Sequence, residues 1–349
     1  MRLGLNVGYW GAGDDADNLA LAEEADRLGY AVAWAAEAYG SDAATVCTWI
    51  AAHTRRMDVG SAVLQIPARS PAMTAMTAAT LDTLSGGRFR LGLGVSGPQV
   101  SEGWHGVRYD KPLARTREYV AIVRAALRRD RVEFHGAHYE LPLPDGPGKA
   151  LRLTVHPVRE HLPLYLAAVG PKNLELAGEI ADGWLGIFVS PDHLDDQLAQ
   201  VRTGREKVGS GLDGFDVVAN VALSVGDDVA SAADPLRANA ALYVGGMGSR
   251  QQNFYNALAR RMGYDEAAER VQDLYLAKDY AGAAAAVPQQ FLEQTALVGP
   301  PARIAERMQA YAAAGVTTLS LMPAGETLDE RRAALRTAVD ALEAAGVGS

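Results

Sequence analysis

The feature that most constrains the fold is a regular alternation along the chain, in which a short apolar run is followed by a longer run with helical spacing. The apolar runs cover residues 2–8, 31–36, 58–64, 89–95, 164–168, 184–189, 216–223 and 316–321. Continuous apolar runs suit strands that are buried on both faces, so this order predicts a parallel sheet covered by helices. Eight such strand–helix units favour a closed α/β TIM barrel, (β/α)8, over an open doubly wound sheet.

Two segments interrupt the alternation. Residues 132–162 hold strand-like runs at 134–141 and 151–154 around a turn rich in proline and glycine, which predicts a small antiparallel excursion. Residues 229–295 have helical patterns and predict an insertion into the barrel. The chain, 1–349, is therefore expected to form one barrel domain with both insertions near the barrel mouth.

Charge and composition argue against several classes of function. The net charge of −9 argues against nucleic-acid binding, because such proteins present a basic face to phosphates. Cys47 is the only cysteine, so neither an intrachain disulfide nor a site with several thiolate ligands can form. His135 and His138 have no third ligand near them in the sequence, so no metal site is expected.

The sequence gives no sign of membrane association. No apolar stretch approaches the roughly 20 residues that span a bilayer. The expected strand at 2–8 leaves no room for a signal peptide, so we expect a cytoplasmic protein.

In a barrel of this kind, the residues that act on ligands follow the C-terminal ends of the strands. The candidate positions are Glu37 and Tyr39 after the second strand, 62–65 at the end of the third, 96–105 after the fourth and 169–172 after the fifth. His105 lies in the loop after the fourth strand, where it is placed to reach a substrate, although a single loop histidine is more often only solvated.

The start of the helix after the fifth strand has the properties of an anion site. Gly170 allows close backbone approach, Pro171 suits the first helical position, and Lys172 adds a positive charge to the free N–H groups of the first turn. This pattern favours a phosphate ligand, and ordinary helix-start chemistry is the alternative.

Residues 92–97 match the dinucleotide-binding fingerprint GxGxxG letter for letter. The fingerprint requires a helix that begins at its last glycine, and no helix is expected here before Pro112. We therefore interpret the match as accidental and expect the glycines to line a crowded strand end.

Several stretches resemble a known family, namely 34–42, 59–65, 94–104, 109–113, 166–172, 181–184 and 245–255. They are similar to the luciferase-like monooxygenase superfamily, and most similar to its branch that uses the deazaflavin coenzyme F420 and includes methylenetetrahydromethanopterin reductase. The resemblance implies a luciferase-like TIM barrel and an F420-dependent oxidoreductase that acts on a small-molecule substrate.

The resemblance also implies roles for particular residues. A non-proline cis peptide at Ala62–Val63 would support the cofactor ring, and Gln65 would contact its pyrimidine side. Glu37 matches an acidic position near the ring. With the helix start, the expected cofactor-binding residues are Glu37, Ala62, Val63, Gln65, Ser101, Val169, Gly170, Pro171 and Lys172.

Two departures from the family bear on the reaction. The sugar-phosphate dehydrogenase of this group has a catalytic histidine where this chain has Ala38, and its glutamate after the fourth strand is replaced within 97–99. We therefore expect hydride transfer in the reducing direction to an electrophilic carbon, with Glu37, Tyr39 and His105 as candidates for handling the proton.

Two alternatives remain beside the F420-dependent reductase. One is a luciferase-like monooxygenase that holds FMN at the same phosphate site, and the other is a non-catalytic cofactor or metabolite carrier. We expect Arg250, Asn253, Phe254 and Tyr255 of the insertion to cap the pocket, and an oligomer surface is the alternative for its helices at 253–262 and 267–276. A homodimer is expected from the resemblance and from exposed small residues on the first helices, Ala43, Ala44, Ala51 and Ala52.

Overall fold

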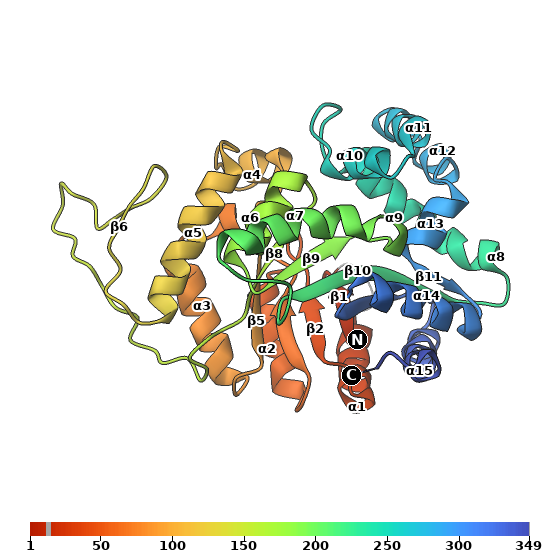
Figure 1. Cartoon of the computed structure of the whole chain (residues 1–349), viewed down its shortest axis with the longest axis horizontal. Helices are drawn as coiled ribbons and strands as arrows, with labels where there is room; N and C mark the ends of the chain where they lie inside the picture. Colours follow the sequence, from red (N-terminus) through yellow and green to blue (C-terminus); the bar gives the residue numbers. More distant parts are fainter. Residues whose placement is uncertain (12–14, 349) are drawn as a thin grey trace.

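The computed structural model describes residues 1–11 and 15–348 and has the closed barrel that the alternation predicts (Figure 1). Its eight strands pair in parallel around the ring in chain order and return to the first. They are β1 (Arg2–Gly8), β2 (Val32–Ala35), β3 (Asp58–Ser61), β5 (Phe89–Gly94), β8 (Leu164–Ala167), β9 (Gly183–Ile187), β10 (Asp216–Val225) and β12 (Thr318–Pro323). The short β4 (Leu64–Gln65) continues the line of β3 along β5, and β11 (Leu297–Gly299) pairs with the end of β10.

Helices follow the strands and cover the outside of the barrel. They are α1 (Asp15–Leu28), α2 (Ala43–His53), α3 (Pro71–Leu84), α5 (Pro112–Leu127), α6 (Pro171–Ile180), α7 (Leu194–Lys207), α14 (Pro301–Ala314) and α15 (Leu328–Ala345). Local sequence sets several starts: the Asp42 side chain caps α2, Ser70 caps α3, and Thr327 with Glu330 forms a capping box on α15.

The barrel interior changes character along its axis. At the N-terminal end, the Arg90 guanidinium lies 2.8 Å from the Asp58 carboxylate and 3.1 Å from the Asp216 carboxylate. Above this ionic layer, the rings of Trp34 and Tyr165 meet edge to face with centroids 5.2 Å apart. The middle of the barrel is therefore filled, and a ligand has to enter from the C-terminal end.

Residues 229–295 form a helical insertion with its own hydrophobic core. Its elements are α8 (Val229–Ala233), η3 (Asp234–Leu236), α9 (Arg237–Ala241), the π-helix η4 (Leu242–Gly246), α10 (Phe254–Arg261), α11 (Asp265–Leu276), α12 (Tyr280–Ala285) and α13 (Gln289–Thr295). Figure 1 shows α10 and α11 at the opposite end of the barrel from the two termini, so the insertion lies at the mouth.

The excursion at 132–162 differs in part from its prediction. An antiparallel pair is present, but it joins β6 (Phe134–His135) to β7 (Glu140–Leu141), and 151–154 forms no strand. The Glu118 carboxylate on α5 accepts the backbone N–H groups of 137–139 at 2.8 to 3.1 Å. This excursion therefore lies beside α5 and not over the strand ends (Figure 1).

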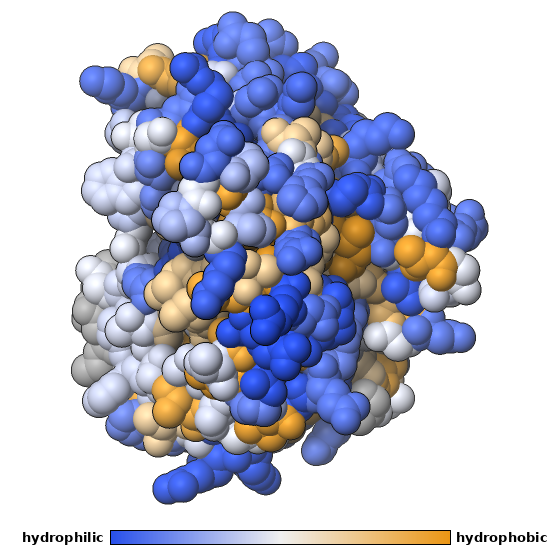
Figure 2. Space-filling model, turned by 90° about the vertical axis from the view of Figure 1, so that its left-hand side faces the viewer, coloured by the Kyte–Doolittle hydropathy of each residue, from blue (hydrophilic) through white to orange (hydrophobic). Residues whose placement is uncertain are grey.

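The excursion also contributes to the surface. Leu143, Leu151 and Val158 are exposed apolar residues on it. Figure 2 views this side of the molecule and shows apolar residues surrounded by hydrophilic ones.

No helix in the described part of the chain is long and apolar enough to cross a membrane.

A short helix, α4 (Pro98–Gly103), begins directly after Gly97, so the expectation of no helix before Pro112 was wrong. Pro98 at its first position has the φ angle that a helix start needs, which the sequence interpretation overlooked. The glycines do line a crowded strand end: a Cβ at Gly92 would overlap the Ser61 carbonyl, and one at Gly94 would lie 2.5 Å from the Val63 side chain.

The small residues expected on the first helices are mostly not exposed. Ala43 and Ala51 are buried, Ala44 is half-buried, and only Ala52 is exposed. Ala43 and Ala51 lie on the face of α2 that packs into the core with Val46, Cys47 and Ile50. Their place in the hydrophobic core gives no support for a dimer.

Candidate active site

Side chains at the C-terminal ends of the barrel strands stay partly accessible, from which we infer a space above them that we call the hollow. Asn6, Ala62, Ala167 and Asn220 lie on or directly after strands of a closed barrel, yet all four are only half-buried. Ala62 and Ala167 pack on the apolar cluster that fills the middle of the barrel. The side-chain amide of Asn6 donates to the Asn220 side-chain oxygen at 3.4 Å. The floor of the hollow is therefore small and apolar, with a pair of amides at one side.

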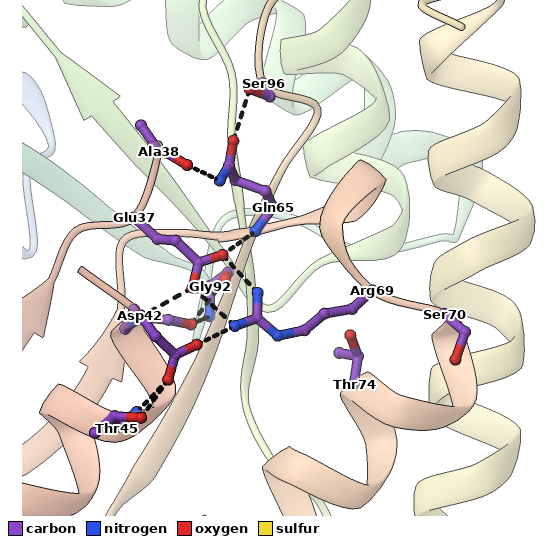
Figure 3. Close-up of polar contacts among 12 residues, drawn as sticks. Glu37, Ala38, Asp42, Thr45, Gln65, Arg69, Ser70, Thr74, Gly92 and Ser96 are labelled. Atoms are coloured by element: carbon purple, nitrogen blue, oxygen red, sulfur yellow. Dashed lines mark hydrogen bonds and ion pairs between the residues drawn. The ribbon is translucent and has the colours of Figure 1, made fainter. Parts of the chain in front are cut away.

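The end of the third strand has the expected geometry. The peptide bond between Ala62 and Val63 is cis, which confirms that prediction. Gln65 is 2% exposed, and both ends of its amide are hydrogen bonded: Nε2 donates to the Ala38 carbonyl at 2.6 Å, and Oε1 accepts from Ser96 Oγ at 2.9 Å (Figure 3). Gln65 therefore joins the loops that follow the second and fourth strands.

Glu37 lies at the centre of a polar network beside the hollow. Its carboxylate forms a two-pronged ion pair with the Arg69 guanidinium, at 2.5 and 2.9 Å, and accepts the backbone N–H groups of Gln65 and Ala43 (Figure 3). The Asp42 carboxylate also pairs with Arg69. The Glu37 side chain is 6% exposed, so it has little access to a ligand in this arrangement.

The other two proton-handling candidates differ in their surroundings. Tyr39 is 63% exposed. His105 is half-buried, and its Nε2 is a buried atom that has no hydrogen-bond partner among the described residues. Ser101 is buried, and its hydroxyl donates to the Val107 carbonyl at 2.7 Å. Of these side chains, His105 alone has a buried polar atom without a partner.

The start of α6 is open to a ligand. Gly170 is the N-cap residue with no side-chain cap, and a Cβ built on it would meet nothing within 4 Å. Lys172 is 82% exposed and lies 3.2 Å from the Glu175 carboxylate. A cavity of about 280 Å³ adjoins this helix start and is lined in part by Val169, Pro171 and Arg261.

Arg261 is a candidate site residue that the sequence interpretation missed. It lies in α10, and its guanidinium donates to the Val169 carbonyl at 3.0 Å. It forms no ion pair with any described carboxylate, and burial lowers the pKa of its guanidinium. Nothing in the local sequence marks Arg261, because only the packing of the insertion brings it to α6.

The four residues expected to cap the pocket lie in different surroundings. Asn253 is the N-cap of α10, where its side chain accepts two backbone N–H groups. Arg250 pairs with Asp273 at the surface, and Phe254 is 39% exposed. Tyr255 is the one that contacts other rings near the strand ends, with its ring centroid 6.5 Å from that of Phe188, the residue after β9.

The described residues contain no group of three or more His, Cys, Asp or Glu side chains that could hold a metal ion. The strand ends and the start of α6 supply amides, hydroxyls, the imidazoles of His105 and His193, and the cations Lys172 and Arg261. This set suits an organic ligand with a flat body and an anionic group.

Comparison with known proteins gives consistent matches. Residues 8–318 match the family model described as luciferase-like monooxygenase. A Mycobacterium tuberculosis protein assigned as a coenzyme F420-dependent oxidoreductase is 42% identical over 331 residues, covering 91% of this chain and 94% of its own length. The 5,10-methylenetetrahydromethanopterin reductase of Archaeoglobus fulgidus is 29% identical over 84% of this chain and 85% of its own.

A comparison with solved structures gives a matching fold. The solved structure of the coenzyme F420-dependent tetrahydromethanopterin reductase from Methanopyrus kandleri superposes with a TM-score of 0.82 and covers 98% of both chains. Its sequence identity of 23% makes this a likeness of fold.

Proposed function

The chain belongs to the luciferase-like monooxygenase family, and from that premise we propose that it is a coenzyme F420-dependent oxidoreductase. It moves hydride between the deazaflavin and an electrophilic carbon of a small molecule, a C=C, C=N or C=O carbon, in the reducing direction. The observation that carries the proposal is geometric: a hollow floored by strand ends and an open helix start lie at the same end of one barrel.

The residues at the mouth fit a deazaflavin with a phosphate group. Gly170 has open space where a side chain would stand, so an anion can approach the first turn of α6 closely. Lys172 and Arg261 add positive charge beside that turn. Ala62, Val63 and Ala167 provide a small apolar surface on which a flat ring can rest.

When bound, F420 supplies the hydride chemistry, and the protein supplies binding and orientation. Gly170, Pro171, Lys172 and Arg261 hold the anionic group. Glu37 acts as a positioning residue, since its ion pair with Arg69 and its bond to the Gln65 backbone fix the loop around the ring site. His105 is the candidate to handle a proton, because among the three candidate side chains its Nε2 is the buried atom that has no described partner.

The proposal is tested by titrating the purified protein with F420 and, separately, with FMN, and following the change in cofactor fluorescence. We expect F420 to bind at micromolar concentration and FMN to bind at least tenfold more weakly. The reduced cofactor should then be oxidised without oxygen when an electrophilic substrate is added.

Two other results point to the alternatives. Tighter binding of FMN, with oxygen consumed by the reduced flavin, identifies a monooxygenase. Binding of F420 without turnover of any alkene, imine or carbonyl compound identifies a carrier.

A further inference from the structure

Three aromatic side chains from separate segments meet at the mouth of the barrel. Phe188 follows β9, Tyr243 lies in the π-helix η4, and Tyr255 lies in the first turn of α10. The ring centroids of Tyr243 and Tyr255 are 4.9 Å apart at 83°, and those of Phe188 and Tyr243 are 5.6 Å apart at 81°. We call these three residues the aromatic cluster. Its edge-to-face contacts are a favourable geometry for aromatic pairs.

Irregular backbone holds two of the rings in place. Phe188 has a φ of 50°, which is rare for a bulky side chain. Tyr243 lies in a π-helix, a form that is uncommon and is found frequently at functional sites. Gly245 and Gly246 let this π-helix lie against the ring of Tyr275, which a Cβ at either glycine would overlap. Unusual backbone at a cleft indicates a functional constraint on the side chains it presents.

The tyrosine hydroxyls at the mouth are free to bind a ligand. Those of Tyr243, Tyr255 and the neighbouring Tyr9 make no hydrogen bond with any described residue. Burial, with smaller contributions from the hydroxyls of Tyr9 and Tyr109, raises the pKa of Tyr255 to about 12. Burial likewise raises the pKa of Tyr9 to about 12, with added effects of Tyr243 and Tyr39. These hydroxyls therefore keep their protons at neutral pH and can donate them to an oxygen acceptor.

The causes of the pKa shifts of these tyrosines also show which charged groups lie near their hydroxyls. Burial and other tyrosine hydroxyls are the causes, and no Asp, Glu, Lys or Arg among the described residues contributes. Asp196 and Arg261, the charged side chains that line a cavity with Phe188, belong to the side of that cavity next to the start of α6, and the Glu37 and Asp42 carboxylates each pair with Arg69. A charged substrate group placed beside the tyrosine hydroxyls would thus lose its hydration without gaining an ionic partner there.

We propose that the aromatic cluster and Tyr9 recognise a planar, uncharged carbonyl compound, with its flat body against the rings and its oxygen accepting from a tyrosine hydroxyl. This inference rests on the proposed function, because it names the substrate class of the same site. The rings select planarity, and the hydroxyls orient the carbonyl.

The experiment uses the full chain loaded with oxidised F420, so that no turnover occurs, and measures binding by calorimetry. Three probes are compared. Benzylideneacetone is a planar, neutral enone, and cinnamate is its anionic counterpart. The third, 4-phenylbutan-2-one, is neutral but not planar. One variant combines Tyr243→Phe and Tyr255→Phe, which removes both hydroxyls and keeps both rings. A second variant, Tyr243→Leu, removes one ring. Tyr280→Phe, at an exposed tyrosine on α12, is the control.

We expect benzylideneacetone to bind at least tenfold more tightly than either other probe. The double phenylalanine variant should weaken its binding about five- to tenfold, the scale of one or two neutral hydrogen bonds. Tyr243→Leu should weaken it further, and Tyr280→Phe should leave it unchanged. The affinity for F420 should be the same in all four proteins.

Absence of benzylideneacetone binding, tighter binding of cinnamate, or unchanged affinity in the double variant would each overturn the inference. The F420 titration separates this failure from that of the proposed function, since a protein that binds F420 but ignores the neutral probe loses only the substrate class. Thermal unfolding of each variant checks that the fold is kept.

Discussion

Glu37 shows how far one side chain's role depends on its partners. Its position after the second strand made it a candidate for proton handling, and the resemblance placed it near the cofactor ring. The structure instead surrounds its carboxylate with the Arg69 guanidinium and two backbone N–H groups. Sequence position predicted that Glu37 lies beside the site, but Arg69 lies 32 residues further on, so the sequence could not reveal the pairing.

Replacing Glu37 with glutamine should therefore affect stability first. The change leaves the mostly buried Arg69 with only Asp42 as an ionic partner. We expect the free energy of unfolding to fall by about 2–3 kcal/mol, near the lower end for a broken buried pair. Urea denaturation measures it, with Glu23→Gln on the exposed face of α1 as the control. Unchanged stability together with lost turnover would instead give Glu37 a direct role in the reaction.

Gly170 and Lys172 test the anion site from two directions. Gly170 has an extended backbone and free space around it. The Gly170→Val variant should therefore fold normally, and the turn before α6 should keep its conformation. The valine should block the ligand and weaken F420 binding at least tenfold, or about 1.4 kcal/mol. Gly211→Val, at another open glycine, is the control.

Lys172→Ala should have a smaller effect than Gly170→Val. The lysine side chain is exposed and already pairs with Glu175, so its charge is screened by water. We expect F420 binding to weaken by about 0.3–1 kcal/mol, an effect that shrinks as salt is added. Titration at two ionic strengths measures it, and a loss of turnover at full affinity would contradict the assignment.

At the scale of elements, periodicity predicted the eight barrel units but not the irregular pieces between them. The strands and their helices follow from apolar runs and helical spacing, which persist over many residues. The π-helix η4 packs on Tyr275 and differs from an α-helix by its i→i+5 hydrogen bonds, which no residue pattern in 242–246 marks. The six-residue α4 is too short for a periodicity to be recognised.

The end of α1 gives a prediction about pH. Asp26 accepts the backbone N–H groups of Arg55, Arg56 and Met57, just before β3, at 2.7 to 3.0 Å. Burial alone would raise the pKa of Asp26, but these donors outweigh it and hold the pKa below the ordinary 3.8. A carboxylate with a lowered pKa stabilises the fold above its unfolded pKa, and that stability is lost as the pH falls through the folded value.

Asp26→Asn should therefore lower the free energy of unfolding at pH 7 and flatten its decline below pH ~4. Urea denaturation between pH 7 and pH 3 measures both effects. A variant whose stability falls with acid as steeply as that of the parent would show that Asp26 contributes nothing to the acid sensitivity.

At the scale of the whole molecule, exposed apolar side chains on two neighbouring helices favour a homodimer, in place of the alanines from which it was expected. Trp49 of α2 and Met73 and Met76 of α3 are each at least half exposed, and the two helices pack side by side. Large exposed apolar side chains on adjacent helices are typical of an association surface. Alanine positions in the sequence could not show which face of α2 is outward.

We expect light scattering to give the mass of a dimer, and Trp49→Glu to give that of a monomer. Leu151→Glu, at an exposed apolar residue on the excursion, should leave the dimer intact. If light scattering gave the mass of a monomer at every concentration of the unaltered protein, the prediction of a dimer would be wrong.

The single cysteine makes the molecule unusually convenient to probe. Cys47 is fully buried, donates to the Gly60 carbonyl at 3.3 Å, and has a pKa raised by burial. Maleimide should therefore leave the native protein unlabelled and modify one thiol after denaturation. Cysteines introduced at Trp104 and Tyr280 would then be the only labelling positions, and a pair of fluorophores there would act as a ruler between α4 and the insertion, reporting in real time whether the entrance narrows when ligands arrive.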